Sequence, residues 1–187
     1  MRITRYILLA APLLLCGCDT AELIGRPAPD LDRNYSVTAE IDYGSSSAVA
    51  DITRNAEGNW NVSFTEPAYL MGVELALADG KVSATLGDIT VTADSSNVYT
   101  LMPDIITEVL DSLPDVAAEN ISESEGIFTL NTAYGSDRAV VTSDSSGGLL
   151  TLKCPAQQLS VRFSDQQDIT PLDTTETEET FEFIIEE

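Results

Sequence analysis

The chain has 187 residues, with 31 acidic and 9 basic side chains, no histidine and a formal net charge of −22. This charge excludes an ordinary nucleic-acid-binding surface, because such surfaces need clustered Lys and Arg to displace counterions. The lack of histidine excludes Ser-His-Asp and Cys-His catalytic sites and histidine-bearing zinc sites. The length suits one domain with a sizeable core.

The first residues have the layout of a secretory signal. Arg2 and Arg5 give a basic start, and residues 6–15 form an apolar run. A membrane span needs about 20 apolar residues, so this run is too short to be one. The run ends in Leu15-Cys16-Gly17-Cys18, which resembles the lipobox of bacterial lipoproteins. We therefore predict that residues 1–17 are a signal peptide and that Cys18 carries a diacylglycerol and palmitate-type anchor.

The predicted anchor implies an extracytoplasmic protein attached to a bacterial membrane through lipid on Cys18. Two or more acyl chains would hold it stably. An anionic membrane surface would repel a domain this acidic, so the lipid is the expected membrane contact. Residues 18–34 are predicted to be the lipidated Cys and a tether, because they contain Gly25, Pro27 and Pro29 and show no sustained period. The part from residue 19 to residue 34 reaches at most about 50 Å.

From Tyr35 onward, apolar and polar residues alternate, which is typical of strands with one buried face. Asp79-Gly80 is a strong hairpin signal between two of these segments. The alternation predicts about ten short strands, centred on residues 35–43, 48–52, 60–65, 73–77, 82–86, 89–93, 128–132, 139–142, 150–154 and 159–163.

Residues 104–113 break this alternation and predict a helix. Pro103 and Asp104 suit its first turn, and Pro114 ends it. One face, within an arc of about 140°, is apolar; it comprises Ile105, Ile106, Val109, Leu110 and Leu113. The opposite face is expected to be polar, with Asp104, Thr107, Glu108, Asp111 and Ser112.

These elements predict a mostly β (α+β) domain over residues 35–164. Ten strands side by side would be about 47 Å wide, whereas one helix covers about 10–12 Å. The sheet must therefore curl or split. We expect a strongly curved antiparallel half-barrel with one covering helix, and a β-sandwich is the alternative. Residues 165–187 predict an acidic tail, in which Phe181, Phe183 and Ile185 alternate as in a short strand.

Several residues together resemble small bacterial lipoproteins of the LolA/LppX-like group. They are Trp60-x-Val62-x-Phe64-x-x-Pro67-x-x-Leu70-x-Gly72-Val73, Asp79-Gly80-Lys81-Val82 and Leu159-x-Val161-x-Phe163-Ser164. The predicted helix lies between the second and the third of these stretches. The resemblance covers residues 35–164. It implies an open half-barrel whose concave face is closed by helices and binds lipid or acyl chains, although this sequence predicts one helix where a full lid would use more.

Two functions follow as expectations. The first is a cell-envelope lipoprotein that binds a lipid or another hydrophobic ligand. Its cleft is predicted beneath the helix, where Met71 would act as an adaptable gap-filler, lined by Trp60, Val62, Phe64, Leu70, Met71, Ile105, Ile106, Val109, Leu110 and Leu113. The alternative is an envelope lipoprotein that meets a protein partner and whose cleft is filled by its own side chains. An open apolar cavity would favour the first function, and a packed interior would favour the second.

No catalytic motif stands out. Cys154 lies near a predicted strand end and is expected to be a small buried hydrophobe. The Gly80-Lys81 pair lacks the remaining residues of a phosphate-binding loop, and Asp144-Ser145-Ser146-Gly147 lacks the later ligands of a calcium loop. We therefore expect a non-enzymatic protein without cofactor or metal.

Overall fold

The computed structural model describes residues 29–94 and 102–170. The predicted signal peptide, Cys18 and most of the predicted tether and tail lie outside these residues. Among the residues described, no helix is long and apolar enough to span a membrane. The elements are β1 (Tyr35–Tyr43), β2 (Ser46–Ala56), β3 (Asn59–Glu66), β4 (Val73–Ala78), β5 (Lys81–Leu86), β6 (Ile89–Asp94), α1 (Met102–Asp111), η2 (Leu113–Asp115), η3 (Ala118–Asn120), β7 (Ile121–Ser124), β8 (Ile127–Tyr134), β9 (Asp137–Asp144), β10 (Leu149–Cys154), η4 (Pro155–Gln157) and β11 (Leu159–Asp168).

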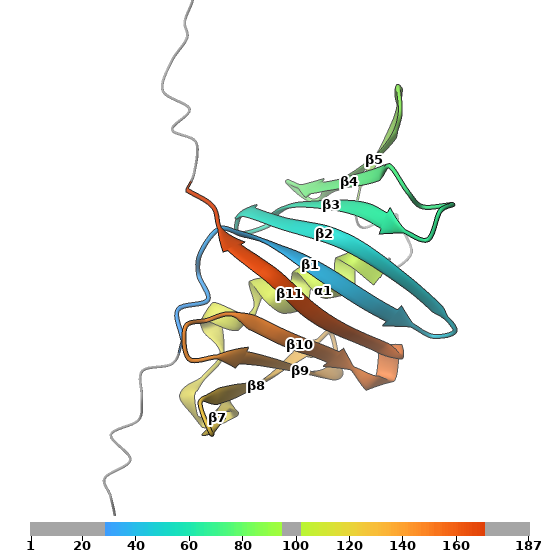
Figure 1. Cartoon of the computed structure of the whole chain (residues 1–187). Helices are drawn as coiled ribbons and strands as arrows, with labels where there is room; N and C mark the ends of the chain where they lie inside the picture. The colour runs from blue at the N-terminus through green and yellow to red at the C-terminus, as the bar shows by residue number, and fades with distance from the viewer. Residues whose placement is uncertain (1–28, 95–101, 171–187) are drawn as a thin grey trace, which may run out of the picture.

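The eleven strands within residues 29–94 and 102–170 belong to one open antiparallel sheet, in the order β6-β5-β4-β3-β2-β1-β11-β10-β9-β8-β7. Most neighbours are joined by short turns, and Asp79 and Gly80 both have positive φ (52° and 69°), as the predicted hairpin requires. The first and last strands pair at the centre, and Ile169 donates its N–H to the carbonyl oxygen of Asn34 at 2.9 Å. The sheet is strongly curved, with α1 on one side of its centre (Figure 1). The predicted half-barrel with one covering helix is confirmed, and the β-sandwich alternative is wrong.

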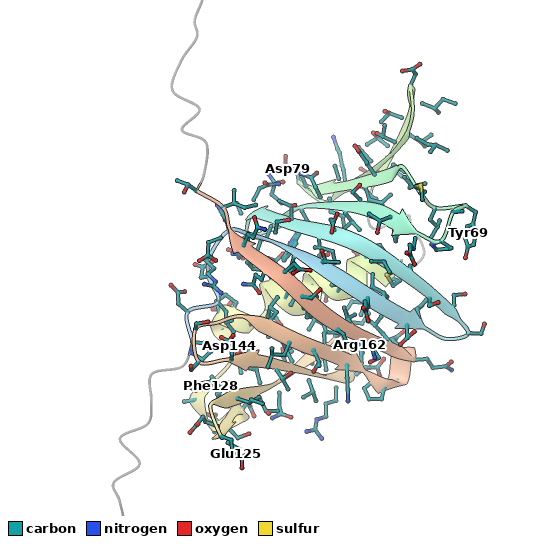
Figure 2. The ribbon with its side chains drawn as sticks, in the orientation of Figure 1. Tyr69, Asp79, Glu125, Phe128, Asp144 and Arg162 are labelled. Atoms are coloured by element: carbon teal, nitrogen blue, oxygen red, sulfur yellow. The ribbon has the colours of Figure 1, made fainter. Side chains whose placement is uncertain are left out.

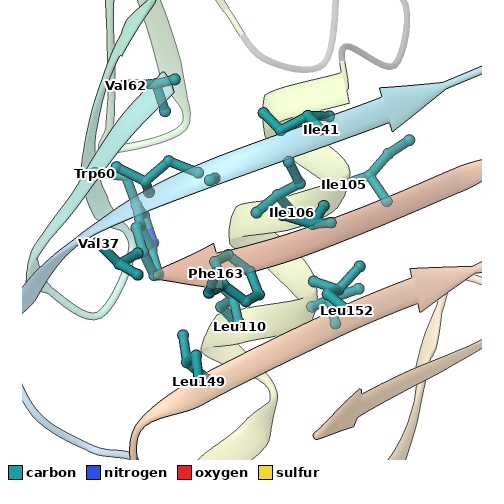
Figure 3. Close-up of a cluster of buried hydrophobic side chains, with 14 of the residues drawn as sticks. Val37, Ile41, Trp60, Val62, Ile105, Ile106, Leu110, Leu149, Leu152 and Phe163 are labelled. Carbon is teal, nitrogen blue, oxygen red and sulfur yellow. The ribbon is translucent and has the colours of Figure 1, made fainter. Parts of the chain in front are cut away.

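The core lies between α1 and the inner face of the sheet. Inner-face residues of β1–β3 alternate with exposed or half-buried ones, as the period of two predicts. They meet the apolar stripe of α1 in one cluster (Figure 3). Burial of this stripe stabilises the helix, because a ten-residue helix is marginal alone in water.

The structure differs from the sequence-based elements in several places. The helix begins at Met102 and ends at Asp111, two residues earlier than predicted at each end, so that Leu113 lies in η2. Thr107 is buried although the pattern predicts it on the polar face. Its hydroxyl donates to the backbone carbonyl of Asp104 at 3.2 Å, which satisfies the buried group. Residues 116–121 contain η3 and lead into β7, a strand that the alternation does not predict.

Candidate functional site

The space beneath α1 is occupied by packed side chains. Eight of the ten residues predicted to line a cleft are buried members of the core cluster (Figure 3): Trp60, Val62, Phe64, Ile105, Ile106, Val109, Leu110 and Leu113. Three surface hollows lined by described residues, of about 810, 480 and 390 Å³, include none of the ten. The structure thus brings these eight residues together as core.

The other two predicted cleft residues lie in the loop between β3 and β4. Leu70 is half-buried and packs against the core cluster, whereas Met71 is 61% exposed and Tyr69 is 77% exposed. The backbone N–H groups of Leu70 and Met71 both donate to the carbonyl oxygen of Pro67, at 2.8 and 3.2 Å. The loop therefore holds Met71 away from the packed interior and near solvent, with Tyr69 at the tip of the loop (Figure 2).

The inner face of the sheet continues beyond the helix onto β4, β5 and β6. The strand pairing places three apolar rows on this face, namely Val73–Leu86–Ile89, Leu75–Ala84–Val91 and Leu77–Val82–Ala93. Leu75, Leu77 and Val82 are buried, but Leu86, Ile89 and Val91 are 57%, 71% and 64% exposed. We call Leu86, Ile89 and Val91, with half-buried Val73 and Ala84, the open inner face.

The helix is too small to cover this surface. Its ten residues give a length of about 15 Å, whereas eleven strands would span about 52 Å if flat. β5 also projects away from the body of the sheet (Figure 1). The apolar inner face of the sheet therefore extends beyond α1, and the part that α1 does not cover is exposed to solvent.

The opposite face of the same hairpin is polar. The hydroxyl of Ser83 lies 2.7 Å from that of Thr92, and the hydroxyl of Thr85 lies 3.0 Å from that of Thr90. Neighbouring residues of a strand point to opposite faces of the sheet. These polar pairs therefore lie on the face opposite the three apolar rows. The apolar surface is consequently confined to one side of the hairpin, continuous with the core.

A buried arginine joins the sheet, the helix and the segment before β1. Arg54 is 2% exposed, and its Nε donates to Asp111 Oδ1 at 3.2 Å. Its Nη1 donates to the carbonyl oxygen of Arg33 at 2.9 Å and to Asp32 Oδ1 at 3.2 Å. The guanidinium also lies 5.9 Å from the ring centroid of Trp60. These contacts satisfy a charge that would otherwise be costly to bury.

This cluster was not predicted from the sequence. The sequence did indicate that Arg54 is buried, because it continues the inward-facing positions of Ala48, Ala50 and Ile52 on β2. An arginine at an inward position needs a carboxylate partner. Asp111, at the end of the amphipathic helix, was such a candidate.

The thiol of Cys154 is fully buried at the end of β10. Burial raises the pKa of this thiol above its ordinary value, and the nearby Asp137 charge adds to the effect. A neutral, inaccessible thiol is a poor nucleophile. This environment agrees with the prediction that Cys154 is a small core residue.

Comparisons with known proteins give structural neighbours only. No family model matches the chain, and neither does any curated protein. Among solved structures, the chain is similar to an uncharacterized conserved protein from Thermus thermophilus, with 10% identity, 74% of this chain and 80% of the other covered and a TM-score of 0.49.

Two further neighbours have names. The LolA superfamily protein NE2245 from Nitrosomonas europaea is 11% identical, with coverage of 78% and 90% and a TM-score of 0.39. LprF from Mycobacterium bovis is 14% identical, with coverage of 75% and 91% and a TM-score of 0.38. A LolA superfamily protein is therefore among the solved structures that this chain is similar to. The curved sheet and its covering helix are established by the strand pairing and the helix described above.

Proposed function

We propose that this chain is a non-enzymatic, lipid-anchored protein of the bacterial cell envelope that binds an acyl chain or another apolar group on its open inner face. One observation carries the proposal: Leu86, Ile89 and Val91 lie on the core side of the sheet yet are more than half exposed. An apolar surface continuous with a core, and left uncovered, suits a hydrophobic ligand.

The proposed site differs from the cleft predicted beneath α1. Ile105 and Ile106 are fully buried among sheet residues, so a ligand there would have to displace packed core side chains. On β5 and β6 a ligand would displace water instead. The exposed thioether of Met71 and the ring of Tyr69, on the loop leading into β4, provide adaptable apolar groups near the same end of the hairpin.

The matched pair Val91→Asp and Thr92→Asp tests this function. The two residues are neighbours on β6, both exposed, and they face opposite sides of the sheet. A fluorescent fatty-acid probe is titrated into the full chain carrying each change. We expect Val91→Asp to weaken probe binding at least tenfold, or about 1.4 kcal/mol, and Thr92→Asp to leave it unchanged. Equal effects of the two changes would contradict the proposal.

The alternative function, an envelope lipoprotein that meets a protein partner, has its own supporting observation. The space beneath α1 is filled by packed side chains, and a packed interior is what we expect of a protein with this function. If the chain has this protein-partner function, it should bind no fatty-acid probe at concentrations of about 100 μM, equivalent to roughly 5.5 kcal/mol of affinity. That result would favour the protein-partner function.

A further inference from the structure

The edge strand β6 is suited to accept another strand. It ends the open sheet, and within the described residues it pairs only with β5. Its register against β5 is regular from Ile89 to Asp94, without a bulge. It contains neither lysine nor proline, the residues that commonly protect an edge. Its outward N–H and C=O groups are therefore available for pairing.

The C-terminal segment 181–185 has the matching pattern. Phe181, Phe183 and Ile185 alternate with Glu182 and Ile184. In an antiparallel pair with Phe183 opposite Val91, Phe181 faces Ala93 and Ile185 faces Ile89, since paired positions change in opposite directions. All three apolar pairs then lie on the inner face. Glu182 and Ile184 lie beside Thr92 and Thr90 on the polar face.

The direction and the reach of the chain agree with this pairing. One row of paired residues crosses the sheet from Asp168 through Tyr35, Arg54, Trp60, Leu77 and Val82 to Ala93. The chain thus leaves β11 at the end of the sheet where β6 finishes, and a segment running back along β6 is antiparallel to it. A strand added beyond β6 lies seven strand spacings from β11, or about 33 Å, and residues 169–180 reach about 40 Å.

We propose that residues 181–185 add to β6 of the same chain as a twelfth strand, with Phe183 opposite Val91. The other edge fits less well, because β7 has four residues and exposes Ser122, Glu123 and Ser124. A second copy also fits less well. A second copy would have to associate from solution, whereas a tethered segment has a high effective concentration.

Hydrogen exchange tests the pairing without any ligand. The full chain is compared with the same chain ending at residue 170. We expect the β6 amides to exchange at least tenfold faster after truncation, while the amides of β1–β3 keep their rates and so report an intact fold. Unchanged β6 rates would overturn the proposal. The outcome is independent of the proposed function, because no probe is present.

Disulfide trapping tests the register. In a full chain with Cys16, Cys18 and Cys154 changed to Ala, Val91→Cys with Phe183→Cys should form an intramolecular disulfide rapidly under mild oxidation. Thr92→Cys with Phe183→Cys is the control, because these side chains would face opposite sides of the sheet. Ser122→Cys with Phe183→Cys reports pairing with β7. Equal trapping in a control pair, or a disulfide between two chains, would overturn the proposal.

Discussion

The indole Nε1 of Trp60 donates a hydrogen bond to Oδ2 of Asp111 at 2.7 Å. This contact joins β3 to the last residue of α1. The same carboxylate accepts bonds from the buried Arg54 and from the backbone N–H of Gly58 at 3.0 Å. One acidic side chain therefore fixes the helix to the turn between β2 and β3, which orients the apolar stripe of the helix toward the sheet.

Removal of this carboxylate should destabilise the domain strongly. Asp111→Ala leaves the buried Arg54 without one of its charged partners and leaves the Trp60 N–H without its acceptor, so we expect a loss of about 3–5 kcal/mol. Urea denaturation followed by far-UV circular dichroism measures it. Asp32→Ala is the control, because the Asp32 side chain is 72% exposed, and its loss should be about 1 kcal/mol or less. Similar small losses for both variants would show that Asp111 does not hold the helix.

The two faces of β3 should respond differently to charge. Val62 is 1% exposed on the inner face, so Val62→Asp buries an unpaired carboxylate and should cost at least about 3 kcal/mol. Asn61 is exposed on the outer face, and Asn61→Asp should change stability by about 0.5 kcal/mol or less. Thermal unfolding of both variants compares them. Equal losses in melting temperature would be incompatible with the described facing of β3.

Glu108 should lower stability at neutral pH. Partial burial, together with the Asp104 charge one turn away, raises the pKa of this carboxyl above its ordinary value of 4.5. The folded chain then binds more protons than the unfolded chain between the two pKa values, so stability falls as pH rises through that window. Glu108→Gln removes this penalty. Melting temperatures should be higher for the variant at pH near 7 and should converge as pH falls to about 4; a difference independent of pH would contradict the assignment.

The anchor prediction concerns Cys18. Cys18→Ala should release the protein from membranes, because the apolar run at residues 6–15 is too short to hold it as a span. Cell fractionation measures the release, and a radiolabelled fatty acid should no longer be incorporated. Continued labelling of the variant would show that lipid is attached elsewhere.

Much of the fold was predictable because the sheet has a regular period. Alternation placed Val62 and Phe64 inward, and the helical stripe placed Ile105 and Ile106 against them. Strand β7 was missed because its four residues include one apolar side chain, Ile121, which is too few to show a period.

The candidate site was less predictable than the fold. Periodicity shows which residues face inward, but it does not show how far a covering helix extends over them. Val62 and Val91 both occupy inward positions on their strands, yet one is buried and the other is 64% exposed. The difference depends on the position of α1 relative to β6, which is a tertiary feature. The open inner face therefore required the structure.

A spin-labelled fatty acid would locate the ligand on the protein and so decide whether the open inner face binds it. Methyl resonances of the full chain are assigned, and a fatty acid carrying a nitroxide on its acyl chain is added. We predict that the methyl groups of Leu86, Ile89 and Val91 broaden, while those of Ile105 and Ile106 keep their intensity. Broadening that is strongest at Ile105 and Ile106 would place the ligand beneath α1, and no broadening at any of these methyl groups would contradict the binding function.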